Sequence, residues 1–277
     1  MKTITNRRAF LGAAAGLAVS GAVPAGAAPR SSAGGLKLGI ASYSLRKFSR
    51  QEAIAMLKTL RIEYVSIKSF HLPYEGSPAE TTAGADEFRQ AGIEVLSGGN
   101  INLQKPGELR PMFEYAKAAG LPMMVCAPRH ETMDAIEELV KEFDIKIAIH
   151  NHGPEDAHFP SPESAFEAVK SRDPRMGLCI DVGHTTRTST NVLESIREAG
   201  PRMFDLHIKD LADLMDKGSQ VEVGRGAMPV AGMFKLLKTM NYQGGVMLEY
   251  EIRADDPLPG MLESVSYMRG VLDGLAG

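Results

Sequence analysis

The sequence predicts a single α/β domain over residues 36–277, a closed (β/α)8 TIM barrel. Three observations favour this fold. Short apolar runs alternate strictly with stretches of helical length, eight such pairs can be counted, and four of the later runs end in a histidine or an acidic residue. Strands that alternate with helices form parallel sheets, and eight units in about 250 residues close into a barrel.

The first half of the domain contains four strand–helix pairs. The strands are expected at 36–42, 62–67, 93–97 and 121–127, and the helices at 49–60, 78–91, 106–119 and 131–143. Pro106 begins the third helix and Gly120 ends it, in agreement with the residue preferences of helix termini. The glycines before Asn100 indicate the end of the third strand.

The second half repeats this pattern. Its strands are expected within the stretches 145–153, 177–184, 203–210 and 245–251, and its helices at 163–171, 191–199, 229–240 and 258–275. Irregular loops are expected at 153–162 and 211–226. An open, doubly wound sheet is the competing fold. It is disfavoured because no glycine-rich phosphate-binding motif follows the first strand, where 42–46 reads Ser-Tyr-Ser-Leu-Arg instead.

Four strands in the second half end in a residue that can bind a metal ion, namely His150, Asp181, His207 and Glu249. Because the carboxyl ends of parallel strands meet at one rim of a barrel, we expect these side chains to converge. Two imidazoles and two carboxylates suit Mn²⁺, Co²⁺ or Zn²⁺ better than Ca²⁺, which takes oxygen ligands, and Mg²⁺ is a further option. A bound ion polarises a substrate carbonyl or hydroxyl, so that a neighbouring carboxylate can move a proton from carbon.

Other polar side chains are expected at the same rim. Lys68 and His71 follow the second strand, and His152 follows the fifth, so all three can bind substrate oxygens, although structural contacts explain lone residues of this kind almost as well. Lys209 follows His207 near the end of the same strand. Strand alternation would direct its side chain outward, but at a strand end the side chain can reach over the site. Arg225 lies between two glycines, which suits a loop that grips a substrate and equally an ordinary charged loop.

Composition excludes some classes of partner. The chain has 277 residues, a formal net charge of -3 and two cysteines. This charge gives no basic surface that could follow a nucleic-acid backbone, so DNA or RNA is not expected as a partner. Two cysteines within apolar runs form no disulfide framework. The oligomeric state is left open, a homo-oligomer included.

Residues 1–27 have the order of a secretory signal peptide, and 28–35 form a flexible lead-in. The pair Arg7-Arg8 with Phe10 and Leu11 precedes an apolar run at 12–23 and small residues at 25–27, as in twin-arginine signals. A transmembrane anchor needs about 20 apolar residues, more than this run offers. We therefore expect export by the twin-arginine machinery to the periplasm or beyond, with no membrane anchor after cleavage.

Four motifs carry a resemblance to a known family: 180–184 (Ile-Asp-Val-Gly-His), 207–210 (His-Ile-Lys-Asp), 224–226 (Gly-Arg-Gly) and 248–251 (Leu-Glu-Tyr-Glu). With them, residues 36–275 resemble the xylose isomerase-like sugar phosphate isomerase and epimerase family, which includes D-tagatose 3-epimerase and inosose dehydratase. The resemblance implies that Asp181, His207 and Glu249 are metal ligands and that His184 and Arg225 contact the substrate. Many members carry a glutamate where this chain has His150.

The resemblance implies a metal-dependent isomerase or epimerase that acts on a carbohydrate or polyol through an enediolate, and the signal peptide adds the expectation that it is exported. With His150 as a ligand, Glu249 remains as the base, and His152, His184 or Lys209 can serve as the opposing acid. Glu249, His184 and Lys209 are therefore the expected catalytic residues. The same set also suits a lyase or dehydratase acting on a keto-sugar. A non-catalytic sugar-binding barrel is the alternative from another class. The sequence does not identify the sugar.

Overall fold

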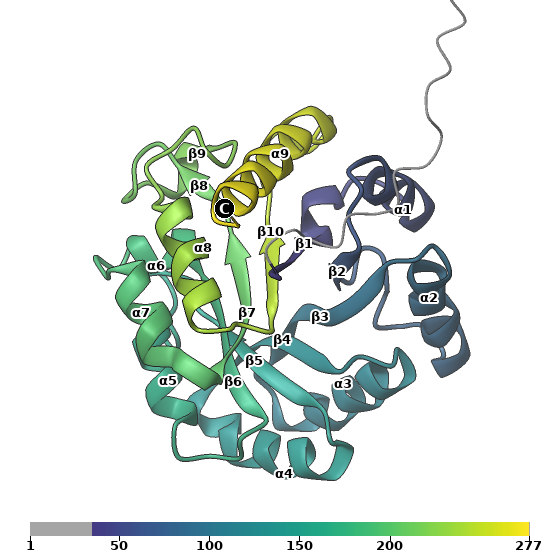
Figure 1. Cartoon of the computed structure of the whole chain (residues 1–277). Helices are drawn as coiled ribbons and strands as arrows, with labels where there is room; N and C mark the ends of the chain where they lie inside the picture. Colours follow the sequence, from purple (N-terminus) through teal and green to yellow (C-terminus); the bar gives the residue numbers. More distant parts are fainter. Residues whose placement is uncertain (1–34, 277) are drawn as a thin grey trace, which may run out of the picture. The chain divides into compact units, whose positions relative to one another are not determined.

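Eight parallel strands close into a barrel in the computed structural model, which describes residues 35–276. Strands β1 to β6 each pair with the next along the chain, and β10 pairs with both β7 and β1 to complete the ring. Figure 1 shows helices around the outside of this ring. The predicted TIM barrel is confirmed. The barrel strands are β1 (Lys37–Ala41), β2 (Tyr64–Ile67), β3 (Glu94–Leu103), β4 (Met123–Pro128), β5 (Lys146–His150), β6 (Met176–Asp181), β7 (Met203–Ile208) and β10 (Gly245–Leu248).

The helices form because apolar residues recur on one face and because polar residues cap the ends. Ser49 and Ser77 each accept a hydrogen bond from the third backbone N–H of the helix that follows, where a glutamate bonds back to the serine. No helix within residues 35–276 is long and apolar enough to cross a membrane. The main helices are α1 (Arg50–Thr59), α2 (Pro78–Gln90), α3 (Pro106–Ala118), α4 (Met133–Phe143), α5 (Pro162–Val169), α7 (Val192–Ala199), α8 (Val230–Thr239) and α9 (Leu258–Gly274).

Three local features differ from the expectation. Strand β3 does not end before Gly98 but continues to Leu103, because Gly99, with a φ of 131°, makes a bulge at which the register with β4 shifts. The loop 211–226 is not wholly irregular, since β8 (Asp210–Leu211) pairs with β9 (Gln220–Val221). A short helix, α6 (Val182–Thr186), follows β6. The expected signal peptide and residues 28–34 of the lead-in lie outside the described residues.

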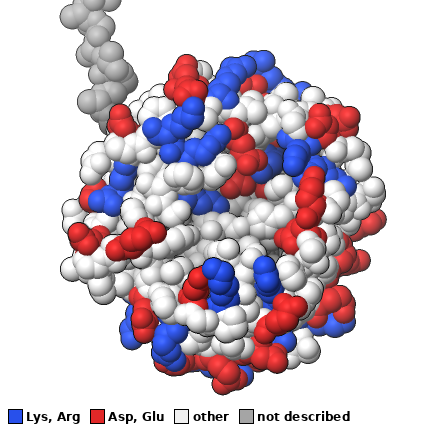
Figure 2. Space-filling model, turned by 180° about the vertical axis from the view of Figure 1, so that it is seen from behind, with Lys and Arg blue, Asp and Glu red and all other residues white. Residues whose placement is uncertain are grey.

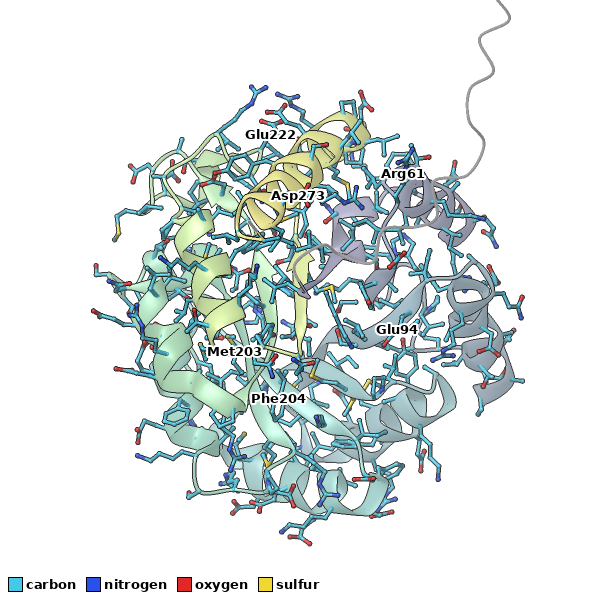
Figure 3. All side chains as sticks on the ribbon, in the orientation of Figure 1. Arg61, Glu94, Met203, Phe204, Glu222 and Asp273 are labelled. Atoms are coloured by element: carbon cyan, nitrogen blue, oxygen red, sulfur yellow. The ribbon has the colours of Figure 1, made fainter. Side chains whose placement is uncertain are left out.

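The two ends of the barrel differ in chemistry. A mainly apolar hollow of about 640 Å³ lies where the strands begin, and Met203 and Phe204 at the start of β7 line it (Figure 3). The opposite end, where the strands finish, carries buried charges and histidines. The architecture therefore separates an apolar end from a polar end.

Tyr250 anchors the chain just beyond β10. Its backbone N–H donates to Ser44 Oγ at 2.8 Å, and its hydroxyl donates to Glu222 Oε1 at 3.0 Å. The buried ring lies against Gly260 of α9, where a Cβ atom would overlap the hydroxyl. In Figure 3, Glu222 lies beside α9. This contact fixes the segment that carries Glu249.

We expect Gly260→Ala to lower the free energy of unfolding by about 1–3 kcal/mol, because the added methyl group overpacks a rigid site. Gly270→Ala is the matched control in the same helix, since a Cβ there meets nothing within 4 Å. It should leave stability unchanged or raise it by up to about 1 kcal/mol. Urea denaturation of both variants checks the difference, and equal midpoints would contradict the packing argument.

Candidate metal and substrate site at the barrel rim

The structure brings the four predicted metal-binding residues together. One donor atom from each of His150, Asp181, His207 and Glu249 lies within 4.8 Å of the other three, and all four residues are buried. His150 Nε2 lies 3.0 Å from His207 Nδ1 and 3.5 Å from Asp181 Oδ2, and His207 Nδ1 lies 3.3 Å from Glu249 Oε2. We call these residues the four-donor cluster.

The strand ends explain this convergence. Asp181 is the register partner of His207, and Glu249 follows Leu248, the partner of Ile208, so the three side chains leave the carboxyl ends of adjacent strands. Asn151 ties β5 to β6, because its Oδ1 accepts from the backbone N–H of Asp181 at 2.9 Å. The ladder therefore sets the positions of the donors before any ligand binds.

Lys209 neutralises the carboxylates of the cluster. Its ammonium lies 3.0 Å from Asp181 Oδ2, 3.1 Å from Glu249 Oε2 and 2.6 Å from Glu251 Oε2. Lys68 approaches the other oxygen of Glu249, Oε1, at 3.4 Å. Both lysines are buried, so these charges interact in a medium of low dielectric constant.

Burial and charge oppose each other in this cluster. Burial alone would raise the pKa of the Asp181 carboxyl, but Lys209 and the neighbouring histidines hold that pKa well below its usual value. The pKa of Glu249 is lowered in the same way, with Lys209, His207 and Lys68 outweighing burial. Burial lowers the pKa of His150 well below the usual value. The cluster thus offers ionised carboxylates and an uncharged imidazole at neutral pH, the forms that bind metal ions.

The donor spacing fits a divalent ion. Bonds of about 2.1 Å separate neighbouring ligand atoms by about 3.0–3.4 Å in tetrahedral or octahedral geometry. The observed separations of 3.0, 3.3 and 3.5 Å agree with these values. Asp181 Oδ2 in the cluster and the second ring nitrogens, His150 Nδ1 and His207 Nε2, are buried without a hydrogen-bond partner among residues 35–276. His150, Asp181, His207 and Glu249 can therefore hold an ion such as Mn²⁺, Co²⁺ or Zn²⁺.

A pocket of about 290 Å³ opens above the cluster. Figure 2 shows a hollow near the middle of this face, with acidic and basic side chains gathered around it. Of the residues expected to bind substrate, Lys68, His152 and His184 line the pocket. The complete lining consists of Tyr43, Lys68, Ser69, Phe70, Asn100, His150, His152, His184, Glu249 and Glu251.

His152 has partners on both ring nitrogens. Asn100 Nδ2 lies 2.7 Å from His152 Nε2, and Asp156 Oδ2 lies 3.3 Å from Nδ1. The Asp156 carboxylate accepts a hydrogen bond from the Nδ1–H of His152, so Nε2 carries no proton and accepts from the Asn100 amide. His152 therefore orients Asn100 at the wall of the pocket.

The structure places His71 and Arg225 away from the pocket lining. His71 is buried, with Nδ1 2.9 Å from Ser42 Oγ and Nε2 3.2 Å from the Leu45 carbonyl. Arg225 is exposed and pairs with Glu263 of α9, with Nη2 2.8 Å from Oε2. Both residues make structural contacts in this arrangement, and substrate binding by either stays a prediction.

Asp210 fixes the loop that carries Arg225. Its carboxylate accepts hydrogen bonds from the backbone N–H groups of Gly224 at 2.8 Å, Gly226 at 3.0 Å and Met228 at 2.9 Å. A buried carboxylate with several backbone donors is strongly stabilised. Two of the sequence motifs, 207–210 and 224–226, are thus joined in one structural unit.

Sequence reasoning missed the aromatic edge of the pocket. Tyr43 and Phe70 meet edge to face with ring centroids 5.8 Å apart, and the Phe70 side chain is more than half exposed. Tyr43 lies just after β1 and Phe70 lies just after β2. Their positions after strand ends could have indicated that they line the pocket, had aromatic residues been considered along with polar ones. Glu251, which was expected in a loop, also lines the pocket and binds Lys209.

Comparison with known proteins gives the family. Residues 38–271 match the Xylose isomerase-like TIM barrel family. The chain therefore belongs to this family, which confirms the resemblance carried by the four motifs.

Individual relatives are distant. An uncharacterized protein of Mycobacterium leprae (strain TN) is 27% identical over 136 residues, which is 42% of this chain and 48% of that protein, so the chain spans about half of the relative's length. The IolI protein, solved with a binding zinc atom, is 20% identical with a TM-score of 0.69, over 86% of this chain and 99% of that one. D-Psicose 3-epimerase of Clostridium cellulolyticum H10, solved with D-tagatose, is 14% identical with a TM-score of 0.71, over 86% and 99% of the two chains. At these identities the two solved structures show a shared fold alone.

Replacing Lys209 with methionine should lower the free energy of unfolding by about 3–5 kcal/mol in the presence of a chelator, because it leaves buried carboxylates without a counter-charge. Denaturant titration at neutral pH measures this loss. Lys47→Met is the matched control, since Lys47 pairs with Asp255 at the exposed surface, and it should cause little change. A Lys209 variant as stable as the control would show that the ammonium does not hold the carboxylates together.

Proposed function

We propose that the protein is a divalent-metal-dependent isomerase or epimerase that acts on a carbohydrate or polyol. The observation that carries the proposal is the four-donor cluster beneath a polar pocket at the carboxyl end of a barrel, the end at which barrel enzymes perform catalysis. The shared fold with a sugar 3-epimerase supports this substrate class.

The cluster supports a defined division of labour. His150, Asp181, His207 and Glu249 would hold a Mn²⁺, Co²⁺ or Zn²⁺ ion, which would supply Lewis acidity to a substrate oxygen. Glu249 faces the pocket as an ionised carboxylate and accepts that proton. Lys68 and Lys209 hold Glu249 in place, and His184 of α6 contacts a substrate oxygen. Because burial would lower the pKa of Lys209 but Asp181 and Glu249 raise it, Lys209 acts through its fixed charge rather than as a proton donor.

A keto-sugar lyase or dehydratase is the second candidate, and one observation favours it. The donor on β5 is His150, an uncharged imidazole, so the cluster holds one pocket-facing carboxylate, Glu249, rather than one on each side. A single base can remove a proton before a leaving group departs, as in a lyase or dehydratase. It can equally return the proton to the substrate, as in an isomerase.

The first test combines metal content with proton exchange. The purified protein is reconstituted with Mn²⁺, Co²⁺ or Zn²⁺, its metal is measured by elemental analysis, and ketohexoses are incubated with it in deuterated water. We expect about one ion per chain and deuterium at a sugar carbon. His150→Ala should weaken metal binding by at least about tenfold, and Glu249→Gln should slow exchange by about 10²–10⁴-fold.

Two controls and the product analysis make the test decisive. His130→Ala and Glu131→Gln change exposed residues outside the pocket. They should alter neither the metal content nor the rate of deuterium exchange. A new sugar isomer supports the isomerase, whereas loss of water or cleavage supports the lyase. A wild-type protein that takes up none of the three ions contradicts the metal site and favours a non-catalytic sugar-binding barrel.

We also propose that the protein is exported through the twin-arginine pathway and acts in the periplasm or outside the cell. The Arg7-Arg8 pair before an apolar run supports this proposal. Changing both arginines to lysine should retain the unprocessed protein in the cytoplasm, as cell fractionation and immunoblotting would show. Arg30→Lys is the control outside the motif. Unchanged export of the double variant would contradict this route.

A further inference from the structure

His184 is held at the edge of the pocket by its backbone. Its N–H donates to Asp181 Oδ1 at 2.8 Å, which places His184 in the first turn of α6 directly after β6. Its ring lies 5.9 Å from the ring of His150 and 5.8 Å from that of His152. The side chain therefore has a fixed origin beside the four-donor cluster.

Arg187 closes the helical turn behind His184. Its Nη1 lies 3.0 Å from His184 Nδ1, and its guanidinium is buried against Glu155, which bonds to Nη2. Gly153 leaves room for the pair, because a Cβ at this position would lie 3.0 Å from Arg187 Nη1 and 3.3 Å from His184 Nδ1. A loop glycine and an acidic residue of the β5–α5 connection thus enclose the arginine.

The chemistry of this contact fixes the tautomer of His184. A guanidinium group has donors and no acceptor, and it stays charged up to about pH 12. His184 Nδ1 must therefore accept the hydrogen bond with its lone pair. The ring proton is left on Nε2, to which no hydrogen bond is found among residues 35–276.

We propose that Arg187 is a positioning residue that keeps His184 with its ring proton on Nε2, so that His184 donates a hydrogen bond to a substrate oxygen in the pocket. This inference rests on the proposed function for the identity of the substrate but not for the tautomer. The fixed tautomer restricts which substrate groups His184 can bind, because an N–H donor recognises an acceptor such as a carbonyl or an enediolate oxygen. It also assigns His184 the role of stabilising charge on oxygen rather than that of delivering a proton to carbon.

The tautomer can be read directly from ring nitrogen NMR signals. In protein labelled with ¹⁵N-histidine, long-range proton–nitrogen correlations distinguish a protonated from an unprotonated ring nitrogen. The His184 signals are identified by their absence in His184→Gln. We expect an unprotonated Nδ1 and a protonated Nε2 in the wild type. A wild-type ring with its proton on Nδ1 overturns the inference without any need for a folded Arg187 variant.

Variants of the arginine then test cause. Arg187→Met removes the donor at similar volume and should give signals from both tautomers, whereas Arg187→Lys keeps a donor and should restore the wild-type pattern. Arg110→Met, which breaks an exposed pair with Glu142, is the matched control and should change nothing. An unchanged His184 pattern in a folded Arg187→Met protein overturns the assignment of Arg187.

Exchange kinetics separate this inference from the proposed function. If ketohexoses exchange deuterium, Arg187→Met should slow exchange by about 10–100-fold, with partial recovery in Arg187→Lys. Equal exchange rates in the wild type and Arg187→Met would overturn the positioning role. If no sugar exchanges deuterium with the wild type, the proposed function fails, while the ring signals still test the tautomer and the role of Arg187 in fixing it.

Discussion

The site depends on the balance of buried charge at the end of the barrel. Asp181 and Glu249 are carboxylates removed from water, and two such groups close together both stay ionised only when cations compensate them. Lys209 lies between them and Lys68 approaches from the other side. Glu251 offers Lys209 a third carboxylate outside the four-donor cluster. A divalent ion held by the cluster would compete with Lys209 for Asp181 and Glu249. Glu251 would then remain as the ion-pair partner of the Lys209 ammonium.

Such a charge cluster needs a rigid frame, which the barrel provides through long-range contacts. Asn151 joins the ends of β5 and β6, Asp210 gathers the backbone of the loop before α8, and Tyr250 locks the chain after β10. Asn151 and Asp210 accept hydrogen bonds from backbone N–H groups, and the Tyr250 hydroxyl donates one to Glu222, so each link is made by a buried side chain rather than by further ladder pairing. The strands set where the donors begin, and these three residues prevent the strand ends from relaxing away from one another.

The strand-end rule explains both what could be predicted and what could not. It located His150, Asp181, His207 and Glu249, because a residue at the end of a parallel strand has little freedom in where it lies. It does not apply to Arg225, whose loop is shaped by hydrogen bonds to Asp210 rather than by the end of a barrel strand. The bulge at Gly99 could not be predicted from the sequence. Glycines in a strand-like run indicate a turn or a bulge equally well until the pairing with the neighbouring strand is known.

The presence of histidine on β5 shapes what the pocket can do. An imidazole donor binds an ion without adding a negative charge, so two lysines suffice to compensate the cluster. The carboxylates that line the pocket among the described residues, Glu249 and Glu251, both follow β10 and so approach a substrate from one side. The other titratable groups of the lining include three histidines, His150 at the end of β5, His152 in the loop after it and His184 in α6, and His152 has both nitrogens engaged. His184, held by Arg187, is therefore the group best placed to act on the opposite side, as a hydrogen-bond donor to oxygen.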